Sequence, residues 1–185
     1  MTDRKTPEIM VERINAERLR DMYAAILESR QELFAEDFIP SPGFAMEDLE
    51  GWTKAQDELW ENDKQYFFQI IESTTSQVLG MAFLNHITRH YQMANLGYWV
   101  RTGRIGEGIA TAAAKLVARS AFEQFGFQRL EIVVQVNNLP SLKVADKIGA
   151  VREGLLRNRL YLHGSPRDAY MHSLIPVDYG IHKTA

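Results

Sequence analysis

The stretch Asn95-Leu-Gly-Tyr-Trp-Val-Arg-Thr-Gly-Arg-Ile-Gly-Glu-Gly-Ile-Ala-Thr111 combines three local patterns. Residues 96–100 place apolar side chains at every second position, as a strand does. Past the glycines, apolar and small residues recur at helical spacing over residues 109–120. Gly106 and Gly108 separate the two patterns. The stretch therefore predicts a strand, a glycine-rich turn and a helix in direct succession.

A glycine turn that opens a helix is suited to binding an anion. Glycine lets the backbone bend and approach a ligand closely, and the first helical N–H groups favour negative charge. No Gly-Lys-Ser/Thr follows, as a P-loop requires, and Thr111 stands where a dinucleotide-binding G-x-G-x-x-G needs another glycine. Two interpretations remain: the pyrophosphate loop of an acyl-CoA-binding protein, or a tight turn that binds nothing.

Size and charge bound the class of protein. With 185 residues, 45% of them hydrophobic, the chain can bury a sizeable core, and we expect a single domain over residues 1–185. A formal net charge of -3 provides no basic footprint, so no direct nucleic-acid binding is expected. The N-terminus lacks a signal-peptide apolar region, and no apolar run approaches the ~20 residues of a membrane span. We expect a cytoplasmic protein without membrane association.

Cysteine and histidine usage narrows the available chemistry. The sequence contains no cysteine, which removes disulfides, thiolate metal sites and a cysteine nucleophile. Its histidines do not follow the spacing of metal ligands, so no metal is predicted.

Apolar patterns along the rest of the chain indicate the order β-α-α-β-β-β-α-β-α-β-β. Asn15 is the expected N-cap of the first helix, whose core face should comprise Leu19, Met22, Tyr23, Ile26 and Leu27. The other helices are expected over 46–62, from 109 to near Gly126, and from Asn138 to a stop at Gly149. The expected strands are 9–14, 66–72, 78–87, 96–100, 130–136, 151–162 and 169–175.

The segment Phe38-Ile-Pro-Ser-Pro-Gly-Phe44 is an unusually apolar loop. Its prolines and glycine end the helical pattern. Such a loop either packs on the core or forms one wall of an acceptor cleft, because binding residues often lie on loops.

Five short motifs follow one another in an order that resembles a known family. Together with the order of elements, they resemble the GNAT acetyltransferases, and more narrowly the RimJ/RimL branch, which N-acetylates the N-termini of ribosomal proteins. The resemblance implies an α+β fold with a mixed, mostly antiparallel twisted sheet of about seven strands, flanked by helices, in which a splayed strand pair holds the cofactor. The motifs are Gly97-Tyr-Trp-Val100, Gly106-Glu-Gly-Ile-Ala-Thr111, Asn138-Leu-Pro-Ser141, Lys147-Ile-Gly149 and Arg152-Glu-Gly154.

The activity implied by this resemblance is acetyl transfer from acetyl-CoA to a primary amine. The acceptor is then the α-amino group of a protein N-terminus, of the ribosomal-protein type, or a small amine. The alternative is a non-catalytic acyl-CoA-binding or sensor module with the same fold, which the departures at Ile105, Glu107 and Ala145 would favour. A homodimer is compatible with both.

The family's phosphate motif, Gln/Arg-x-x-Gly-x-Gly/Ala, falls on Ile105-Gly-Glu-Gly-Ile-Ala110. Ile105 replaces the polar first residue, so backbone amides must make most of the phosphate contacts. Glu107 occupies a position that is basic in many members, and Arg101 and Arg104 are the nearby cations.

The pantetheine arm is expected along the strand that ends at Val100. This strand should splay from strand 130–136, so that its backbone groups pair with the amides of pantetheine. Asn138 is expected to cap its helix, to bind pantetheine, or to do both. The implied cofactor contacts are Tyr98, Val100, Arg101, Ile105, Gly106, Glu107, Gly108, Ile109, Ala110, Thr111, Asn138 and Ser141.

The resemblance also implies which groups move protons. Many members carry a tyrosine acid at the position of Ala145, whereas the RimJ/RimL-like pattern places a serine, here Ser141, near the cofactor sulfur. Ser141 is then the acid that protonates the leaving thiolate, or an ordinary residue in the first turn of its helix. Glu131 is the candidate general base and Glu153 the other available carboxylate; either is equally compatible with a structural role. An α-amino group with a pKa of about 7.7 to 8.0 is already partly neutral at pH 7.

Overall fold

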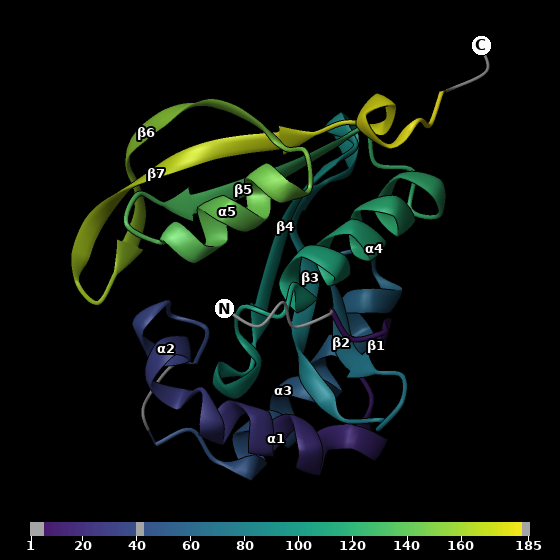
Figure 1. Ribbon diagram of the computed structural model, residues 1–185, viewed down its shortest axis with the longest axis vertical. Helices are drawn as coiled ribbons and strands as arrows, with labels where there is room; N and C mark the ends of the chain where they lie inside the picture. The colour runs from purple at the N-terminus through teal and green to yellow at the C-terminus, as the bar shows by residue number, and fades with distance from the viewer. Residues whose placement is uncertain (1–5, 40–42, 183–185) are drawn as a thin grey trace.

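The strands form one sheet in the order β1-β2-β3-β4-β5-β7-β6 in the computed structural model, which describes residues 6–39 and 43–182 (Figure 1). Neighbouring strands are antiparallel, except that β4 and β5 run parallel. The predicted mixed, mostly antiparallel sheet of the α+β class is thereby confirmed. The strands are β1 (Ile9–Arg13), β2 (Tyr66–Glu72), β3 (Val78–Thr88), β4 (Met93–Val100), β5 (Arg129–Gln135), β6 (Val151–Leu162) and β7 (Ser165–Leu174).

Helices cover both faces of this sheet (Figure 1). Side chains of β4 alternate between the faces, as a strand requires: Leu96 joins the core under α4, and Trp99 joins the core under α1 and α3. The helices are α1 (Leu19–Glu28), α2 (Arg30–Ala35), α3 (Met46–Glu61), α4 (Ile109–Glu123) and α5 (Leu139–Lys147), with 3-10 turns η1 (Ala16–Arg18), η2 (Arg89–Tyr91), η3 (Thr102–Arg104) and η4 (Pro176–Tyr179).

The inner face of α4 consists largely of small side chains. Ala113, Ala114, Ala118 and Ala121 are completely buried. Alanine favours the helix and brings its backbone close to the sheet. The helix ends at Glu123, shortly before its predicted stop. This close packing fixes the position of the N-terminus of α4 at the end of the glycine turn.

β4 and β5 are paired over three consecutive positions, the last of which places Asn95 opposite Glu131. Farther along, β4 continues to pair with β3 as far as Val100, and β5 continues to pair with β7 as far as Gln135. In Figure 1, β5 runs away from β4 beyond their short parallel contact. The predicted splay is confirmed. The opening between the two strands is the stretch over which residues 96–100 of β4 and residues 132–135 of β5 do not pair with each other.

The first predicted helix is divided in the structure. Asn15 accepts a hydrogen bond from the N–H of Glu17 at the start of η1, α1 follows, and α2 begins only after a bend at Ser29. The prediction that Leu27 faces the core is wrong, since its side chain is 46% exposed. Leu27 lies about 100° around the helix from the buried Ile26 and so leaves the apolar stripe.

Two strands begin earlier than predicted. β4 begins at Met93 rather than Leu96, and β7 begins at Ser165 rather than Ala169. In each case backbone pairing with the preceding strand extends the ladder to the turn. Such pairing does not require apolar side chains, so the sequence pattern gave no sign of it.

The apolar loop after α2 is partly packed on the core. Ile39 and Phe44 are buried, whereas Phe38 is 41% exposed and its ring lies edge-on to Phe83. The prolines at 40 and 42, on which the loop prediction rested, lie outside the described residues. Within the ranges 6–39 and 43–182, no helix is long and apolar enough to cross a membrane.

Candidate active site

The glycine turn opens α4 in the predicted manner. Gly106 and Gly108 have φ values of 89° and 80°, in the left-handed region that favours glycine. Gly108 is the N-cap of α4, and its carbonyl accepts the first helical hydrogen bond, from the N–H of Ala112. The N–H groups of residues 109–111 precede that bond and have no partner within the helix. They form a set of donors suited to an anion.

Glu107 does not present an uncompensated charge at this turn. Arg104 Nε lies 2.8 Å from Glu107 Oε2, and the Glu107 side chain is only 11% exposed. Ile105 has the opposite character, with 55% of its surface exposed. The turn therefore offers backbone amides to a phosphate, while its one carboxylate is neutralised by an arginine.

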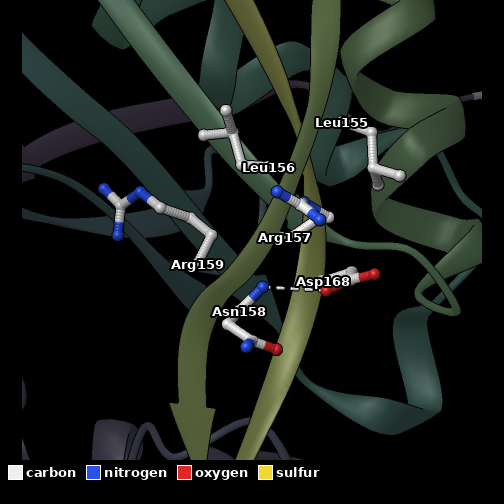
Figure 2. Close-up of a pocket in the computed structure, with 6 residues that line it drawn as sticks. All are labelled: Leu155, Leu156, Arg157, Asn158, Arg159 and Asp168. Carbon is white, nitrogen blue, oxygen red and sulfur yellow. Dashed lines mark hydrogen bonds between the residues drawn. The ribbon is translucent and has the colours of Figure 1, made fainter.

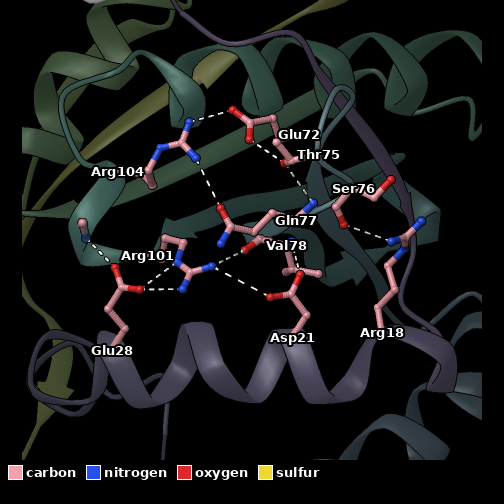
Figure 3. A network of polar contacts seen from close by, with 11 residues as sticks. Arg18, Asp21, Glu28, Glu72, Thr75, Ser76, Gln77, Val78, Arg101 and Arg104 are labelled. Carbon is pink, nitrogen blue, oxygen red and sulfur yellow. Dashed lines mark hydrogen bonds and ion pairs between the residues drawn. The ribbon is translucent and has the colours of Figure 1, made fainter.

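Arg101 and Arg104 are both held by carboxylates of the protein (Figure 3). Arg101 donates to Glu28 through Nε and Nη2, at 2.8 and 2.6 Å. Arg104 Nη2 donates to Glu72 at 2.8 Å, on the hairpin between β2 and β3. The interpretation of Arg101 as a cofactor contact stays a prediction, and in this structure its guanidinium supports the loop from the side of α1.

Two hydroxyl groups meet across the opening between β4 and β5. Tyr98, on the part of β4 that is not paired with β5, lies with its hydroxyl 3.1 Å from Ser141 Oγ, in the first turn of α5. The Tyr98 hydroxyl also donates to the Ser141 carbonyl at 3.3 Å. Burial raises the pKa of Tyr98 to about 12, so its phenol remains protonated at neutral pH. The side chain at the alternative acid position, Ala145, is fully buried.

Asn138 caps α5 as predicted. Its Oδ1 accepts a hydrogen bond from the N–H of Ser141 at 3.1 Å, and proline follows in the first turn. This bond fixes Ser141 at the helix N-terminus, where an adjacent thiolate would be stabilised by the helix dipole.

The two candidate bases are both paired with Arg129. Glu131 Oε1 lies 3.1 Å from Arg129 Nε at the last paired position of β5 and β4. Glu153 is held by Arg129 and by the hydroxyl of Ser173, and the Arg129 guanidinium lowers the pKa of Glu153 to about 2. Such a low pKa makes Glu153 a poor proton acceptor at neutral pH. Glu131 stays the predicted base.

The hairpin of β6 and β7 continues the sheet beyond β5 and reaches α2 at its tip. At its tip, His163 Nε2 lies 2.8 Å from the Phe34 carbonyl of α2, with the two rings 4.6 Å apart. Near its middle, residues 157–159 form a bulge in which the Asn158 N–H donates to Asp168, beside a shallow hollow (Figure 2). Sequence reasoning missed these contacts and the carboxylates of Glu28 and Glu72, because no local pattern marks a partner so distant in the chain.

No group of three or more histidine or carboxylate side chains in the described parts of the chain is arranged to hold a metal ion.

A parallel strand pair that parts beside a glycine-capped helix, within a seven-stranded mixed sheet, defines the fold of a GNAT acyltransferase. The family model described as an acetyltransferase (GNAT) domain matches residues 9–151, and the chain belongs to this family.

Individual relatives agree with this assignment. "Probable N-acetyltransferase YjcK" of Bacillus subtilis (strain 168) is 32% identical over 127 residues, which cover 68% of this chain and 70% of the relative. The "Ribosomal-protein-serine acetyltransferase" of Escherichia coli (strain K12) is 25% identical over 99 residues, 54% of this chain and 55% of the relative. The structure of Mycobacterium smegmatis RimJ in complex with CoA-disulfide is 22% identical and shares the fold with a TM-score of 0.83, covering 92% of this chain and 83% of that one. The resemblance to the RimJ/RimL branch is thus confirmed, and an acyltransferase is favoured over a non-catalytic module.

Proposed function

We propose that this protein transfers the acetyl group of acetyl-CoA to a primary amine, with the α-amino group of a protein N-terminus as the preferred acceptor. The observation that carries the proposal is the opening between β4 and β5, with N–H groups that have no partner within α4 at one end and the Tyr98–Ser141 pair across it.

The residues present fit acetyl-CoA, which supplies the acetyl group as a thioester. The N–H groups of residues 109–111 would bind the pyrophosphate, without help from Ile105. Along β4, hydrogen-bonded positions alternate, and the N–H of Arg101 is bonded to Leu79 of β3. The N–H groups of Tyr98 and Val100 therefore point away from β3, into the opening, where they would pair with pantetheine.

Ser141 is the proposed proton donor to the departing sulfur. Either hydroxyl of this pair can be the donor. When the protonated phenol of Tyr98 donates its single proton to Ser141 Oγ rather than to the Ser141 carbonyl, the serine's own proton is free to point into the opening. Tyr98 thereby orients Ser141 and can return a proton to it when the serine proton moves to sulfur. Many family members carry a tyrosine at the position of Ala145. In this protein we assign the corresponding phenol to Tyr98 on β4.

The preference for an N-terminal α-amino group rests on chemistry and on a relative. With a pKa of about 7.7 to 8.0, an α-amino group is partly neutral at pH 7 and needs only weak base assistance, such as Glu131 could provide. The Escherichia coli relative is named for a ribosomal-protein serine. Small amines are the second acceptor class. The proposal also includes a cytoplasmic location without nucleic-acid binding and is compatible with a homodimer.

The direct test is to incubate the protein with acetyl-CoA and a panel of amines, and to follow release of free thiol. The panel holds peptides with free N-termini, the same peptides with blocked N-termini, lysine side-chain analogues and polyamines. Thiol release that requires a free N-terminus supports the proposal. Thiol release with polyamines alone would identify small amines as the acceptor class. Binding of acetyl-CoA without thiol release with any amine would favour the sensor module.

A further inference from the structure

A carboxylate outside the opening holds the loop that leads into the glycine turn. Glu28, the last residue of α1, accepts hydrogen bonds from Arg101 Nε and Nη2 through one oxygen, at 2.8 and 2.6 Å. Its other oxygen accepts the backbone N–H of Gly103 at 2.6 Å. Charge-assisted bonds of this kind are among the stronger polar contacts in proteins. The Glu28 side chain thus joins the end of α1 to the start of η3 (Figure 3).

The glycine at position 103 allows the Glu28 carboxylate to take this position. A Cβ built on Gly103 would lie 2.7 Å from Glu28 Oε1, closer than such atoms approach each other. Gly103 is not among the glycines with positive φ, so backbone conformation does not require it. The residue leaves room for Glu28.

Ser29, the residue after Glu28, makes a similar contact with η3. Ser29 is 1% exposed, and its Oγ accepts the N–H of Thr102 at 2.9 Å. Two consecutive residues at the bend between α1 and α2 therefore bind two consecutive N–H groups of η3. At the end of η3, Arg104 connects the same loop to Glu72 and Glu107, so the loop is held on both sides just before Gly108.

The bend between α1 and α2 is also connected, through α2, to the β6–β7 hairpin. α2 begins immediately after Ser29, and its Phe34 contacts His163 at the tip of the β6–β7 hairpin. The bend is thus in contact with the donor loop on one side and, through α2, with the hairpin on the other.

We propose that Glu28 is a positioning residue that sets the phosphate-binding amides of the glycine turn and couples them to α1 and α2. This inference rests on the proposed function, because it assigns Glu28 to the binding of acetyl-CoA. Without Glu28, Arg101 and the Gly103 N–H lose their shared acceptor. Arg101 then keeps only its longer ion pair with Asp21 of α1, at 3.9 Å, and its hydrogen bond to the Val78 carbonyl, at 3.1 Å.

The test measures acetyl-CoA affinity by calorimetry for the wild type and for Glu28→Gln, together with the melting temperature of each apoprotein. Glutamine keeps the shape of the side chain but replaces one acceptor oxygen with a donor. We expect Kd for acetyl-CoA to rise about tenfold, as expected for the loss of one to two charge-assisted hydrogen bonds. The matched control is Glu123→Gln, which removes the exposed ion pair with Arg119 on α4 and should leave Kd unchanged.

Gly103→Ala provides a second, independent variant, because it displaces the carboxylate without removing its charge. We expect it to raise Kd in the same direction as Glu28→Gln. A further measurement tests the coupling to α1 and α2. The Kd of an acceptor peptide is measured with and without CoA, and the ratio of these two Kd values should be closer to one in Glu28→Gln than in the wild type.

The results of this test separate the role of Glu28 from the proposed function. Failure of the wild type to bind acetyl-CoA overturns both proposals. Tight binding by the wild type together with unchanged Kd in folded Glu28→Gln or Gly103→Ala overturns the role of Glu28 alone. A lower melting temperature with unchanged Kd would make Glu28 a structural residue only.

Discussion

At the scale of single residues, the hydroxyl of Ser141 is the group most directly tied to chemistry. The negative charge that Ser141 is proposed to stabilise develops on the sulfur only as the thioester breaks, so kcat should fall more than acetyl-CoA affinity. We expect Ser141→Ala to lower kcat by roughly 10²-fold, the usual range for one acid–base group, with acetyl-CoA affinity within a few-fold of wild type. Both quantities should be measured on one preparation. A serine that serves only the first turn of α5 would leave kcat nearly normal.

Glu153 provides a pH-dependent prediction at the same scale. Arg129 holds the pKa of Glu153 at about 2, below its ordinary value of 4.5, so the folded state favours the ionised carboxylate. The stabilisation is then complete above the unfolded pKa and is lost as the pH falls through the folded one. Glu153→Gln should melt below the wild type at pH 7, and the gap should close between pH 4.5 and 2. Melting curves at several pH values measure this, and a gap that stays constant would contradict it.

At the scale of secondary-structure elements, the first prediction concerns the N-terminus of α4. Gly108 has φ of 80°, and a Cβ there would lie 2.5 Å from Thr6 Oγ1, so substitution strains the apoprotein as well. Gly126, past the other end of α4, has φ of 72° with open space around it. Gly108→Ala and Gly126→Ala should each lose about 1–2 kcal/mol of stability.

Only the Gly108 variant should weaken acetyl-CoA binding, because its helix N–H groups are the proposed phosphate ligands. Denaturant unfolding and calorimetry on the two variants separate strain from binding. Equal affinity in the two folded variants would remove the glycine turn from the phosphate site. The contact between position 108 and Thr6 adds a stability cost that no local sequence pattern could reveal.

Hydrogen exchange tests the splayed strand itself. The N–H groups of Tyr98 and Val100 face the opening, whereas those of Arg101 and Thr102 are bonded to Leu79 and Ser29. CoA should slow exchange at Tyr98 and Val100, while Arg101 and Thr102 change little and serve as internal controls. Exchange that is identical at Val100 with and without CoA would show that pantetheine does not pair with β4.

At the scale of the whole molecule, patterns that are local in sequence predicted most of the fold. The strand, glycine turn and α4 are adjacent in the chain, and the Asn138 cap is formed within a few residues of Ser141, so both were accessible from the sequence. The meeting of Tyr98 with Ser141, and of Glu28 with Gly103, depends on how distant segments pack. The exposure of Leu27 likewise depends on how α1 is rotated against the sheet.

Thermal melting with added CoA provides the prediction at this scale. A ligand that binds only the folded chain raises the free energy of unfolding by RT ln(1 + [L]/Kd), about 2.7 kcal/mol at 100 times Kd. The melting temperature should therefore climb steadily with the logarithm of CoA concentration, as a fluorescence-monitored titration would measure. A flat response at saturating concentrations would show that CoA does not bind the native state.

The short parallel contact between β4 and β5 means that the hydrogen-bond ladder consists of two half-sheets, β1 to β4 and β5 to β7, which share a narrow seam. Along the open part of that seam, β4 and β5 give each other no backbone partners, and under the proposed function the pantetheine arm supplies them. Acetyl-CoA would then take part in the hydrogen bonding of the sheet whenever it is bound. Since the unfolded population sets exposure to proteases, the lifetime of the protein would lengthen when its own substrate is abundant and shorten when the supply falls.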